Sequence, residues 1–384
     1  MDFDLSEEQR LLKDSIDRLV DDFYGDLEKR RRYQAEPAGW SAGMWARYAE
    51  LGLLGLPFAE AEGGFGGGAV ETMIVMEAIG RGLVVEPYLA TVVLGGGFLR
   101  LGGSAAQRQE LIPAITGGAL RLAFAHWERQ ARYALHDVGA TARRTAGGWR
   151  LEGEKSVVLH GDSAGKLIVS ARTGGGRSDP SGITLFLVDA DAPGVSRRGY
   201  PTQDGLRVAE LSFAGVEVPA ENVIGEVDNA LPLIEQVTDT AIAAVCAEAV
   251  GAMQALHALT VDYLKTRKQF GVTIGSFQAL QHRAVDMMIA LEQARSMAML
   301  AAMRANGDHR DERRAAVSGA KVQINRSARF IGQEAVQLHG GIGVTMEYKA
   351  GHYFKRLTMV ETQFGDTGHH LRAVEQAGGL LEAA

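Results

Sequence analysis

The segment "TRKQFGVTIGSFQALQHRAVDM", residues 266–287, joins a short charged stretch that contains glycine to a long run with helical periodicity. Arg267 and Lys268 stand near the expected end of a helix, where their side chains can cap free carbonyl groups or bind a phosphate. By itself, this segment does not decide between a structural role and a binding role.

A second segment, "QLHGGIGVTMEYKAGHYFKR" at residues 337–356, contains the paired glycines Gly340 and Gly341. Such a pair marks a tight turn or a place where the backbone approaches a ligand closely. A third segment, "VEVPAENVIG" at residues 216–225, lies upstream. The order and the combination of the three segments are far more specific than any one of them.

On these residues the whole chain resembles the acyl-CoA dehydrogenase family of flavoproteins, with "RKQFG" and "QLHGGIG" as the strongest markers. Within the family, the chain is most similar to the small subunits of pimeloyl-CoA dehydrogenase. The resemblance implies an α+β fold, with an N-terminal α-helical domain, a middle β-domain and a C-terminal four-helix bundle.

The periodicity of apolar residues predicts the same order of domains. Residues 1–118 show helical spacing that begins after the capping-box sequence "SEEQ". Residues 119–226 contain short runs typical of strands, namely "GWRLEGEKSVVL", "KLIVSAR", "GITLFLV" and "VAELSFAGVEV". Residues 227–384 return to long helical patterns. We therefore expect a β-domain between two helical domains, as in an interrupted helical bundle.

The composition of the 384-residue chain is that of an ordinary soluble protein, with 46% apolar and 23% charged residues. The formal net charge of −7 argues against general binding to nucleic acid. Cys246 is the single cysteine, so no intrachain disulfide can form, and a reducing cytoplasm is the expected location. The acidic start, "MDFDLSEEQR", lacks the features of a secretory signal.

The longest apolar tract covers residues 241–261 and has the length of a membrane span. Glu248, Gln254 and His257 interrupt it, however, and alanine dominates its composition. A helix that is apolar on most sides and buried in a bundle explains this pattern better. We therefore expect no association with a membrane.

The resemblance implies binding of FAD and the α,β-dehydrogenation of an acyl-CoA thioester. In that reaction a carboxylate removes the proton next to the thioester while a hydride leaves the β-carbon for flavin N5. An apolar pocket raises the pKa of the carboxylate, and hydrogen bonds to the thioester oxygen stabilise the developing enolate. The resemblance also implies a tetramer and an electron-transferring flavoprotein as electron acceptor.

Each flavin site in this family is shared between two subunits, and the chain keeps the residues that one subunit lends to its neighbour's FAD. The matching residues are Arg267, Phe270, Gln278, Gln337, Gly340 and Gly341. The resemblance places Arg267 at the pyrophosphate, Phe270 near the flavin or adenine, and Gln278 near the adenosine. A guanidinium can bind pyrophosphate in bidentate fashion, and glycine permits close contact with backbone. Thr367 aligns with a further residue that touches the neighbour's FAD.

The residues that would receive a flavin within the chain itself are altered. Family members commonly carry a flavin-binding segment like "TEPGAGSD", which aligns with "HWERQARY" at residues 126–133. Trp127 replaces the hydroxyl residue of that segment, and Arg129 replaces its proline. A second family segment, like "WITNG", reads "VVLHG" here, with Val157 and Leu159 in place of the aromatic residue and the threonine. The polar and aromatic contacts to the flavin are therefore lost.

The catalytic glutamate of the family is missing from both of its usual positions. "FGDT" aligns with the family motif "YEGT", so Gly365 stands in place of the glutamate, and the alternative position holds Ala241. Glu248 lies two turns beyond Ala241 and should reach a different depth. Asp366 follows Gly365 by one residue, which swings a side chain by about 100° on a helix. Asp366 is thus either a displaced base or the N-cap of a helix.

The histidines near these segments are expected to be structural or packing residues. His126 and His160 lie in the altered segments, and His369 and His370 follow Asp366. Adjacent histidines point in different directions on a helix, whereas metal ligands on one helix face need a spacing near i, i+4. No metal site is therefore predicted.

Three functions fit these observations. In the first, the chain is the small subunit of an α2β2 acyl-CoA dehydrogenase whose homologous large subunit supplies the glutamate and the intact flavin cradle. In the second, a self-sufficient homotetramer uses Asp366, or another carboxylate such as Glu361, as the base. In the third, a flavin-free scaffold keeps the fold for assembly or for binding acyl-CoA. The chain keeps the residues that would bind the FAD of a neighbouring subunit and lacks those that would bind a FAD of its own. This combination favours the first function.

Overall fold

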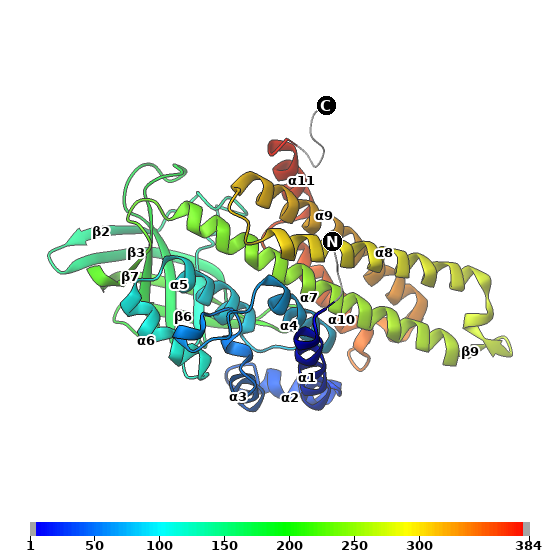
Figure 1. Ribbon diagram of the computed structural model, residues 1–384. Helices are drawn as coiled ribbons and strands as arrows, with labels where there is room; N and C mark the ends of the chain where they lie inside the picture. The colour runs from blue at the N-terminus through cyan, green and yellow to red at the C-terminus, as the bar shows by residue number, and fades with distance from the viewer. Residues whose placement is uncertain (1–4, 379–384) are drawn as a thin grey trace. The chain divides into compact units, whose positions relative to one another are not determined.

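The computed structural model describes residues 5–378, which form two compact units. The helical unit consists of residues 5–32, 69–84 and 242–378, and the sheet unit consists of residues 33–68 and 85–241. The first four residues of the acidic N-terminal stretch lie outside the described residues. Each unit is built from segments that are far apart in the sequence (Figure 1).

The helical unit is dominated by long helices that lie side by side (Figure 1). Its helices are α1 (Glu7–Tyr24), most of α2 (Leu27–Ala35), α4 (Ala69–Gly82), most of α7 (Leu231–Thr266), α8 (Gln278–Arg304), α9 (Arg310–His339), α10 (Lys349–Thr362) and α11 (Thr367–Gln376). Its short elements are the strands β9 (Lys268–Gln269) and β10 (Val272–Thr273) and the 3₁₀ helices η5 (Ile274–Ser276) and η6 (Gly340–Val344).

The first helix begins as its sequence predicts. The hydroxyl of Ser6 accepts a hydrogen bond from the N–H of Gln9 at 3.2 Å, and the Gln9 side chain accepts one from the N–H of Ser6 at 3.0 Å. This reciprocal pair is a capping box, which satisfies two backbone donors at the start of α1. The apolar face that follows is buried and includes Ile16, Leu19 and Val20.

The apolar tract predicted from the sequence lies within α7. Among the described helices, α7 alone is long and apolar enough to cross a membrane, with a mean hydropathy of 1.5 over its most apolar 18-residue window. However, 72% of that window is buried inside the protein. A core helix passes the same test of length and composition, so the buried position agrees with the bundle helix that the sequence favours.

The sheet unit contains most of the strands. Its helices are α3 (Ala42–Glu50), α5 (Gly96–Gly102), α6 (Ala105–Thr116), the π-helix η3 (Leu89–Gly95) and the 3₁₀ helices η1 (Leu53–Gly55), η2 (Glu60–Glu62) and η4 (Ala220–Asn222). Its strands are β1 (Leu122–Ala125), β2 (Thr141–Thr145), β3 (Gly148–Leu159), β4 (Lys166–Arg172), β5 (Ile183–Asp189), β6 (Val195–Pro201), β7 (Arg207–Pro219) and β8 (Val223–Ile224).

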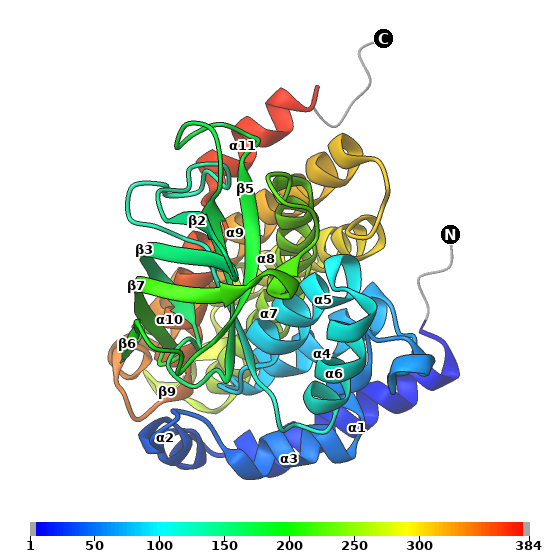
Figure 2. The same ribbon diagram turned by 90° about the vertical axis from the view of Figure 1, so that its left-hand side faces the viewer.

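The eight strands form one sheet in the order β6-β7-β3-β2-β4-β5-β8, with β1 added beside β4. Figure 2 shows β3, β7 and β6 side by side, and their pairing is antiparallel. Trp149 and Leu151, at alternate positions of β3, pack in one core cluster with Phe186 of β5. β3 alternates between buried and exposed residues over much of its length, whereas β1, β4 and β5 are buried at nearly every position and are thus covered on both faces.

The predicted strand runs match the structure closely. "GWRLEGEKSVVL" coincides with β3 and "KLIVSAR" with β4, while "GITLFLV" and "VAELSFAGVEV" fall on β5 and β7 within one residue at each end. The order of helices, then strands, then helices is confirmed. The shorter strands β1, β2, β6 and β8 are further elements of the sheet.

Candidate functional site

All seven predicted cofactor residues belong to the helical unit, and six of them are exposed to solvent. We call this set the donor end: Arg267, Phe270, Gln278, Gln337, Gly340 and Gly341. They follow α7, occupy the turn between β9 and β10, begin α8, and lie in the last turn of α9 and the start of η6. Each side chain or backbone segment in the set is therefore available to a second molecule.

Contacts between helix ends bring the segments of the donor end together. The ring of Tyr263, in the last turn of α7, lies 4.7 Å from the ring of His339, the last residue of α9. Nε of Arg283 on α8 lies 2.5 Å from Oε2 of Glu334 on α9. The end of α7, the start of α8 and the end of α9 thus converge.

Phe270 adopts a backbone conformation that phenylalanine rarely takes. It occupies the two-residue turn between β9 and β10 with a φ of +54°, and Gly271 follows with a φ of +81°. Positive φ at both positions belongs to a type I′ hairpin turn, which favours Asn–Gly. The Phe270 side chain is 91% exposed, and its edge-to-face contact with Phe277, with ring centroids 6.3 Å apart, covers little of it. An outlier of this kind on the surface indicates a binding role.

The paired glycines of the donor end leave open space around them. Gly340 ends α9 with φ +65° and ψ −143°, a conformation that only glycine adopts readily. A Cβ atom built on Gly340 or on Gly341 would meet no heavy atom within 4 Å. Packing within the described chain therefore does not exclude side chains here, and the bare backbone is free to approach a ligand.

Thr367 lies apart from the donor end. It is the first residue of α11, which packs against the first half of α9, where His370 Nδ1 lies 3.1 Å from Ser318 Oγ. Ser318 and Gln337 lie on the same helix, at levels about 28 Å apart. The structure therefore does not bring Thr367 together with the other six predicted residues.

The turn between α10 and α11 excludes a side chain at the position predicted for the base. Gly365 has a φ of +131°, and a Cβ atom built on it would lie 2.6 Å from Nε2 of His370 and 2.7 Å from Cδ2 of His369. Both the backbone conformation and the two rings oppose any residue larger than glycine. The turn is thus built around a glycine and does not accommodate a glutamate at this position.

The two candidate carboxylates of this region both cap α11. Oδ1 of Asp366 accepts a hydrogen bond from the N–H of His369 at 2.8 Å, which makes Asp366 the N-cap. Oε1 of Glu361 accepts from the N–H of Thr367 at 3.2 Å and from its hydroxyl at 2.8 Å. The prediction that Asp366 begins a helix is confirmed. Its proposed role as a base stays a prediction.

Lys321 of α9 holds the same turn from the interior. Its fully buried Nζ donates to the carbonyl oxygens of Val360 at 2.6 Å and Gly365 at 3.3 Å, and to Oδ1 of Asn325 at 2.8 Å. Burial lowers the pKa of this ammonium to about 8. Val360 lies in the last turn of α10, so Lys321 also satisfies a carbonyl at that helix end.

The other predicted base position also lacks a carboxylate. Ala241 is fully buried. Glu248, farther along α7, forms a bidentate ion pair with Arg356 of α10, with oxygen–nitrogen distances of 2.5 and 2.7 Å. Both partners are buried, so the Glu248 carboxylate is committed to the guanidinium.

The two altered segments of the sheet unit lie next to each other. The N–H of Ser156 donates to the carbonyl oxygen of Trp127 at 2.8 Å, which joins "HWERQARY" to β3. Val157 has a φ of +54° where the register between β3 and β7 shifts, and its side chain is 50% exposed. A β-branched residue in this conformation is a rare feature of a bulged strand, and bulges re-aim side chains near binding sites.

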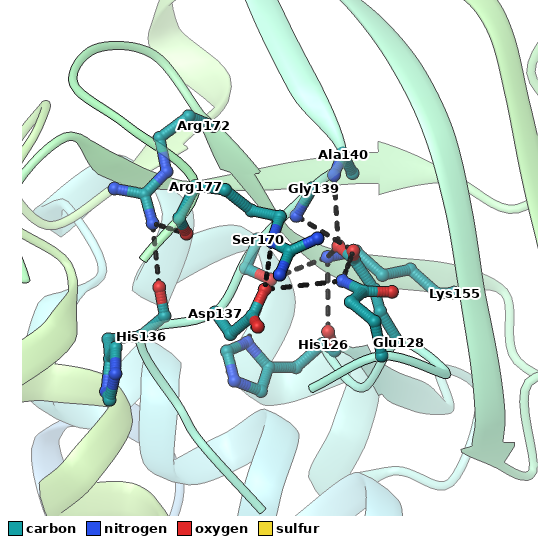
Figure 3. Close-up of polar contacts among 11 residues, drawn as sticks. His126, Glu128, His136, Asp137, Gly139, Ala140, Lys155, Ser170, Arg172 and Arg177 are labelled. Carbon is teal, nitrogen blue, oxygen red and sulfur yellow. Dashed lines mark hydrogen bonds and ion pairs between the residues drawn. The ribbon is translucent and has the colours of Figure 1, made fainter. Parts of the chain in front are cut away.

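A buried ion pair that the sequence analysis missed supports both segments (Figure 3). The fully buried Nζ of Lys155 donates to Oε1 of Glu128 at 2.6 Å, to Oγ of Ser170 at 3.0 Å and to the carbonyl oxygen of His126 at 3.1 Å. Glu128 also accepts from the backbone N–H groups of residues 139–140. Burial raises the pKa of Glu128, but Lys155 outweighs burial and holds that pKa below its usual range.

His126 has the structural role that the sequence predicts. Its Nδ1 lies 2.8 Å from Ser170 Oγ, and its ring stacks on Phe124 at an interplanar angle of 10°. Burial, together with the nearby Lys155, lowers the pKa of His126 to about 3, so the ring is neutral. His160 is also buried, but its Nδ1 has no hydrogen-bond partner within the described residues, so the expectation of a satisfied histidine is wrong for that nitrogen.

On the exposed side of the same region, Glu210 of β7 links the altered residues. It accepts a hydrogen bond from the Tyr200 hydroxyl at 2.6 Å and from the N–H of Val157 at 3.4 Å. Arg129 forms an ion pair with it at 3.4 Å. The arginine that replaces the family's proline is thus engaged beside Val157, where contacts to a flavin would be expected.

The signal for the missed ion pair is the alternation of β3. Trp149, Leu151 and Lys155 are all buried and occupy alternate positions of one strand. An inward-facing lysine in such a strand needs a buried anionic or polar partner. The sequence does not indicate that Glu128 is that partner.

Models of three domains match nearly the whole chain in order. They describe the N-terminal, middle and C-terminal domains of acyl-CoA dehydrogenases and match residues 6–119, 123–216 and 234–378. The acyl-CoA dehydrogenase FadE12 of Mycobacterium tuberculosis is 30% identical over 355 residues, which are 89% of this chain and 88% of that protein. The chain belongs to the acyl-CoA dehydrogenase family. Acyl-CoA dehydrogenases use FAD, as the sequence predicts.

Two solved structures of acyl-CoA dehydrogenases resemble this one over nearly its full length. The ChsE4–ChsE5 complex from Mycobacterium tuberculosis has a TM-score of 0.87 and 27% identity and covers 100% of each chain. A variant of the Tcur3481–Tcur3483 steroid ACAD has a TM-score of 0.86 and 29% identity and covers 97% of each chain. Together with the domain models, they confirm the predicted acyl-CoA dehydrogenase fold.

Proposed function

We propose that this chain is the small subunit of a heteromeric acyl-CoA dehydrogenase, and that its donor end completes the flavin site of a homologous large subunit. The observation that carries the proposal is Phe270, which is 91% exposed in a strained turn. Such a side chain is stabilised when a second molecule covers it. When bound, FAD accepts the hydride that leaves the β-carbon of the acyl-CoA substrate.

The chemistry of the donor end fits FAD. Arg267 offers an exposed guanidinium for the pyrophosphate, and the open space around Gly340 and Gly341 lets backbone approach the cofactor. Gln278 and Gln337 are exposed beside them and offer amide groups for further hydrogen bonds.

A second surface supports association with another chain. Val285, Met288 and Ile289 share one face of α8 at helical spacing, and their side chains are 55%, 47% and 52% exposed. Exposed apolar side chains that gather on one face mark an interaction surface. The similar structures named ChsE4–ChsE5 and Tcur3481–Tcur3483 each combine two protein names, which favours a heteromer as the assembly.

The catalytic carboxylate belongs to the large subunit in this proposal. The strained turn at Gly365 has no space for a glutamate, and Ala241 has no acidic group. An α2β2 assembly related to pimeloyl-CoA dehydrogenase is part of the proposal. The proposed substrate is an acyl-CoA thioester that the large subunit binds.

The test is co-expression with the homologous large subunit, followed by an absorption spectrum of the purified complex. We expect the yellow flavin spectrum in the complex and none in this chain alone. Arg267→Ala should remove most of the flavin, because the pyrophosphate loses its bidentate partner. An active, flavin-loaded preparation of this chain alone whose rate falls in Asp366→Ala would instead support the homotetramer. A colourless complex, unaffected by Arg267→Ala, would support a scaffold.

A further inference from the structure

Two exposed phenylalanines meet at the donor end. Phe270 lies in the hairpin turn between β9 and β10, and Phe277, which directly precedes α8, is 40% exposed. The planes of their rings are inclined by 79°, so the edge of one ring meets the face of the other. Aromatic pairs prefer this arrangement, and here it leaves most of the Phe270 ring uncovered.

Neither phenylalanine is the residue that its local backbone favours. Phe277 is the N-cap of α8, and its side chain makes no capping hydrogen bond. Serine, threonine, aspartate and asparagine are strongly preferred at an N-cap, because their side chains accept a hydrogen bond from the first turn of the helix. Phe270 likewise occupies a turn that favours asparagine. Two neighbouring positions thus carry exposed aromatic rings where the backbone favours small polar residues.

Hydrogen bonds fix Phe277 relative to Arg267. The N–H of Ile274 donates to the carbonyl oxygen of Arg267 at 2.8 Å, and the N–H of Phe277 donates to the carbonyl oxygen of Ile274 at 3.1 Å. The side chains of Ser276 and Gln281 donate to further backbone carbonyl oxygens of the same turn, at 2.7 and 2.8 Å. The ring of Phe277 therefore projects from a braced turn and can hold a neighbouring side chain in place.

The groups around the two rings suit a nucleotide. Arg267 offers a guanidinium for phosphate, and Gln278 and Gln337 offer amide groups. The backbone at Gly340 and Gly341 is open to close approach. Aromatic side chains beside a cationic group bind a planar base and its phosphate together. FAD has this combination, because a pyrophosphate links the parts of the molecule that carry its two aromatic ring systems, isoalloxazine and adenine.

We infer that Phe277 is a positioning residue, which holds the ring of Phe270 so that its free face stacks on an aromatic ring of FAD. The inference rests on the proposed function, which brings the cofactor of the large subunit to the donor end. Isoalloxazine and adenine both offer a flat aromatic face, so either ring system satisfies the chemistry of the site. Phe277 thereby acts on the cofactor through Phe270.

The experiment measures the dissociation constant of FAD from the co-expressed complex, by quenching of flavin fluorescence. Phe277→Leu keeps an apolar side chain at the start of α8 and removes the ring, so FAD binding should weaken by about fivefold. Phe277→Tyr retains the ring and should bind FAD as the wild type does. Val272→Leu is the matched control, because it changes another exposed apolar residue of the same hairpin and should leave the dissociation constant unchanged.

A double variant distinguishes positioning from a merely structural effect. If Phe277 acts through Phe270, Phe277→Leu combined with Phe270→Leu should bind FAD as Phe270→Leu alone does, within about twofold. Effects that multiply, or a Phe277→Leu complex with unchanged affinity, would overturn the inference and leave the proposed function intact. A wild-type complex without FAD would overturn both.

The absorption spectrum of the Phe277→Leu complex at saturating FAD identifies the stacked ring. A shift of the visible flavin band, together with the weaker binding, assigns the stacking to the isoalloxazine. Weaker binding with an unchanged band assigns it to the adenine, which does not absorb in the visible range. Either result supports the inferred role of Phe277.

Discussion

The donor end of the helical unit and the region around Lys155 in the sheet unit treat their polar and aromatic groups in opposite ways. At the donor end, Arg267 and Phe270 are exposed, and Phe270 is held in a strained turn where the nearby ring of Phe277 leaves 91% of it exposed. In the sheet unit, Lys155 and Glu128 are buried, and each makes several hydrogen bonds within the unit. The donor end presents its side chains to solvent, whereas the region around Lys155 pairs its polar groups with hydrogen-bond partners inside the unit.

Under the proposed function, this difference explains how one fold can keep half of a shared site. In that proposal the donor end serves the cofactor of a neighbouring chain, which accounts for its exposed and locally unfavourable features. Val157 and Leu159 carry no polar or aromatic group for a flavin, while the buried network beside them still holds the segment in place.

The largest expected effect comes from breaking the buried ion pair. Lys155→Met should lower the free energy of unfolding by about 3–5 kcal/mol, because Glu128 would be left as an uncompensated buried charge. Lys166→Met is the matched control, since Lys166 pairs with the largely exposed Asp189 and should cost less than about 1 kcal/mol. Urea unfolding of the two variants measures the difference. Equal losses of unfolding free energy would show that the buried pair of Lys155 and Glu128 contributes no more to stability than an exposed ion pair.

The next effect concerns the turn at Gly365, between α10 and α11. Gly365→Ala should lower the free energy of unfolding by about 2–3 kcal/mol, because it adds backbone strain and a contact with the His370 ring. Gly341→Ala, with open space around it, should change stability by less than about 0.5 kcal/mol. Thermal unfolding compares the two. A stable Gly365→Ala variant would mean that the turn can reopen to accept a side chain.

How far the sequence could predict these features depends on how far apart in the sequence the interacting residues lie. The strands β3 and β4 and the cap of α1 follow from local alternation and capping residues, so they were predicted at the right positions. The ion pair of Glu128 with Lys155 joins residues 27 positions apart and has no local signature. The collision at Gly365 depends on a backbone angle that a sequence does not state. The separation of Thr367 from the donor end also appears only in three dimensions.

Acid should destabilise the protein through its buried histidines. Burial lowers the pKa of His126 to about 3, while an unfolded chain binds that proton near pH 6.5. Stability therefore falls as the pH drops from about 6.5 towards 3, by about 1.4 kcal/mol per pH unit for this residue. Denaturant unfolding at pH 4–6 should show that slope reduced in His126→Gln and unchanged in His282→Gln, which alters an exposed histidine. An identical slope in all three proteins would contradict the buried, neutral ring.

The smallest effect on stability tests the strain at the donor end. Phe270→Asn should stabilise the isolated chain by up to about 1 kcal/mol, because asparagine favours the conformation of this turn. The same change should reduce the flavin content of the co-expressed complex. Phe270→Leu keeps the strain and should leave the stability of the isolated chain unchanged. A Phe270→Asn variant that is less stable alone, or fully flavin-loaded in the complex, would contradict the proposal that Phe270 contributes to the flavin site of a neighbouring chain.

The ratio of FAD to protein chains in the purified complex, counted by native mass spectrometry, tests the central claim most directly. If this chain lends its donor end and holds no flavin of its own, the complex should contain one FAD for every two chains, and the isolated chain should contain none. One FAD for every chain would contradict the account, because the cradle around Val157 would then bind a flavin after all.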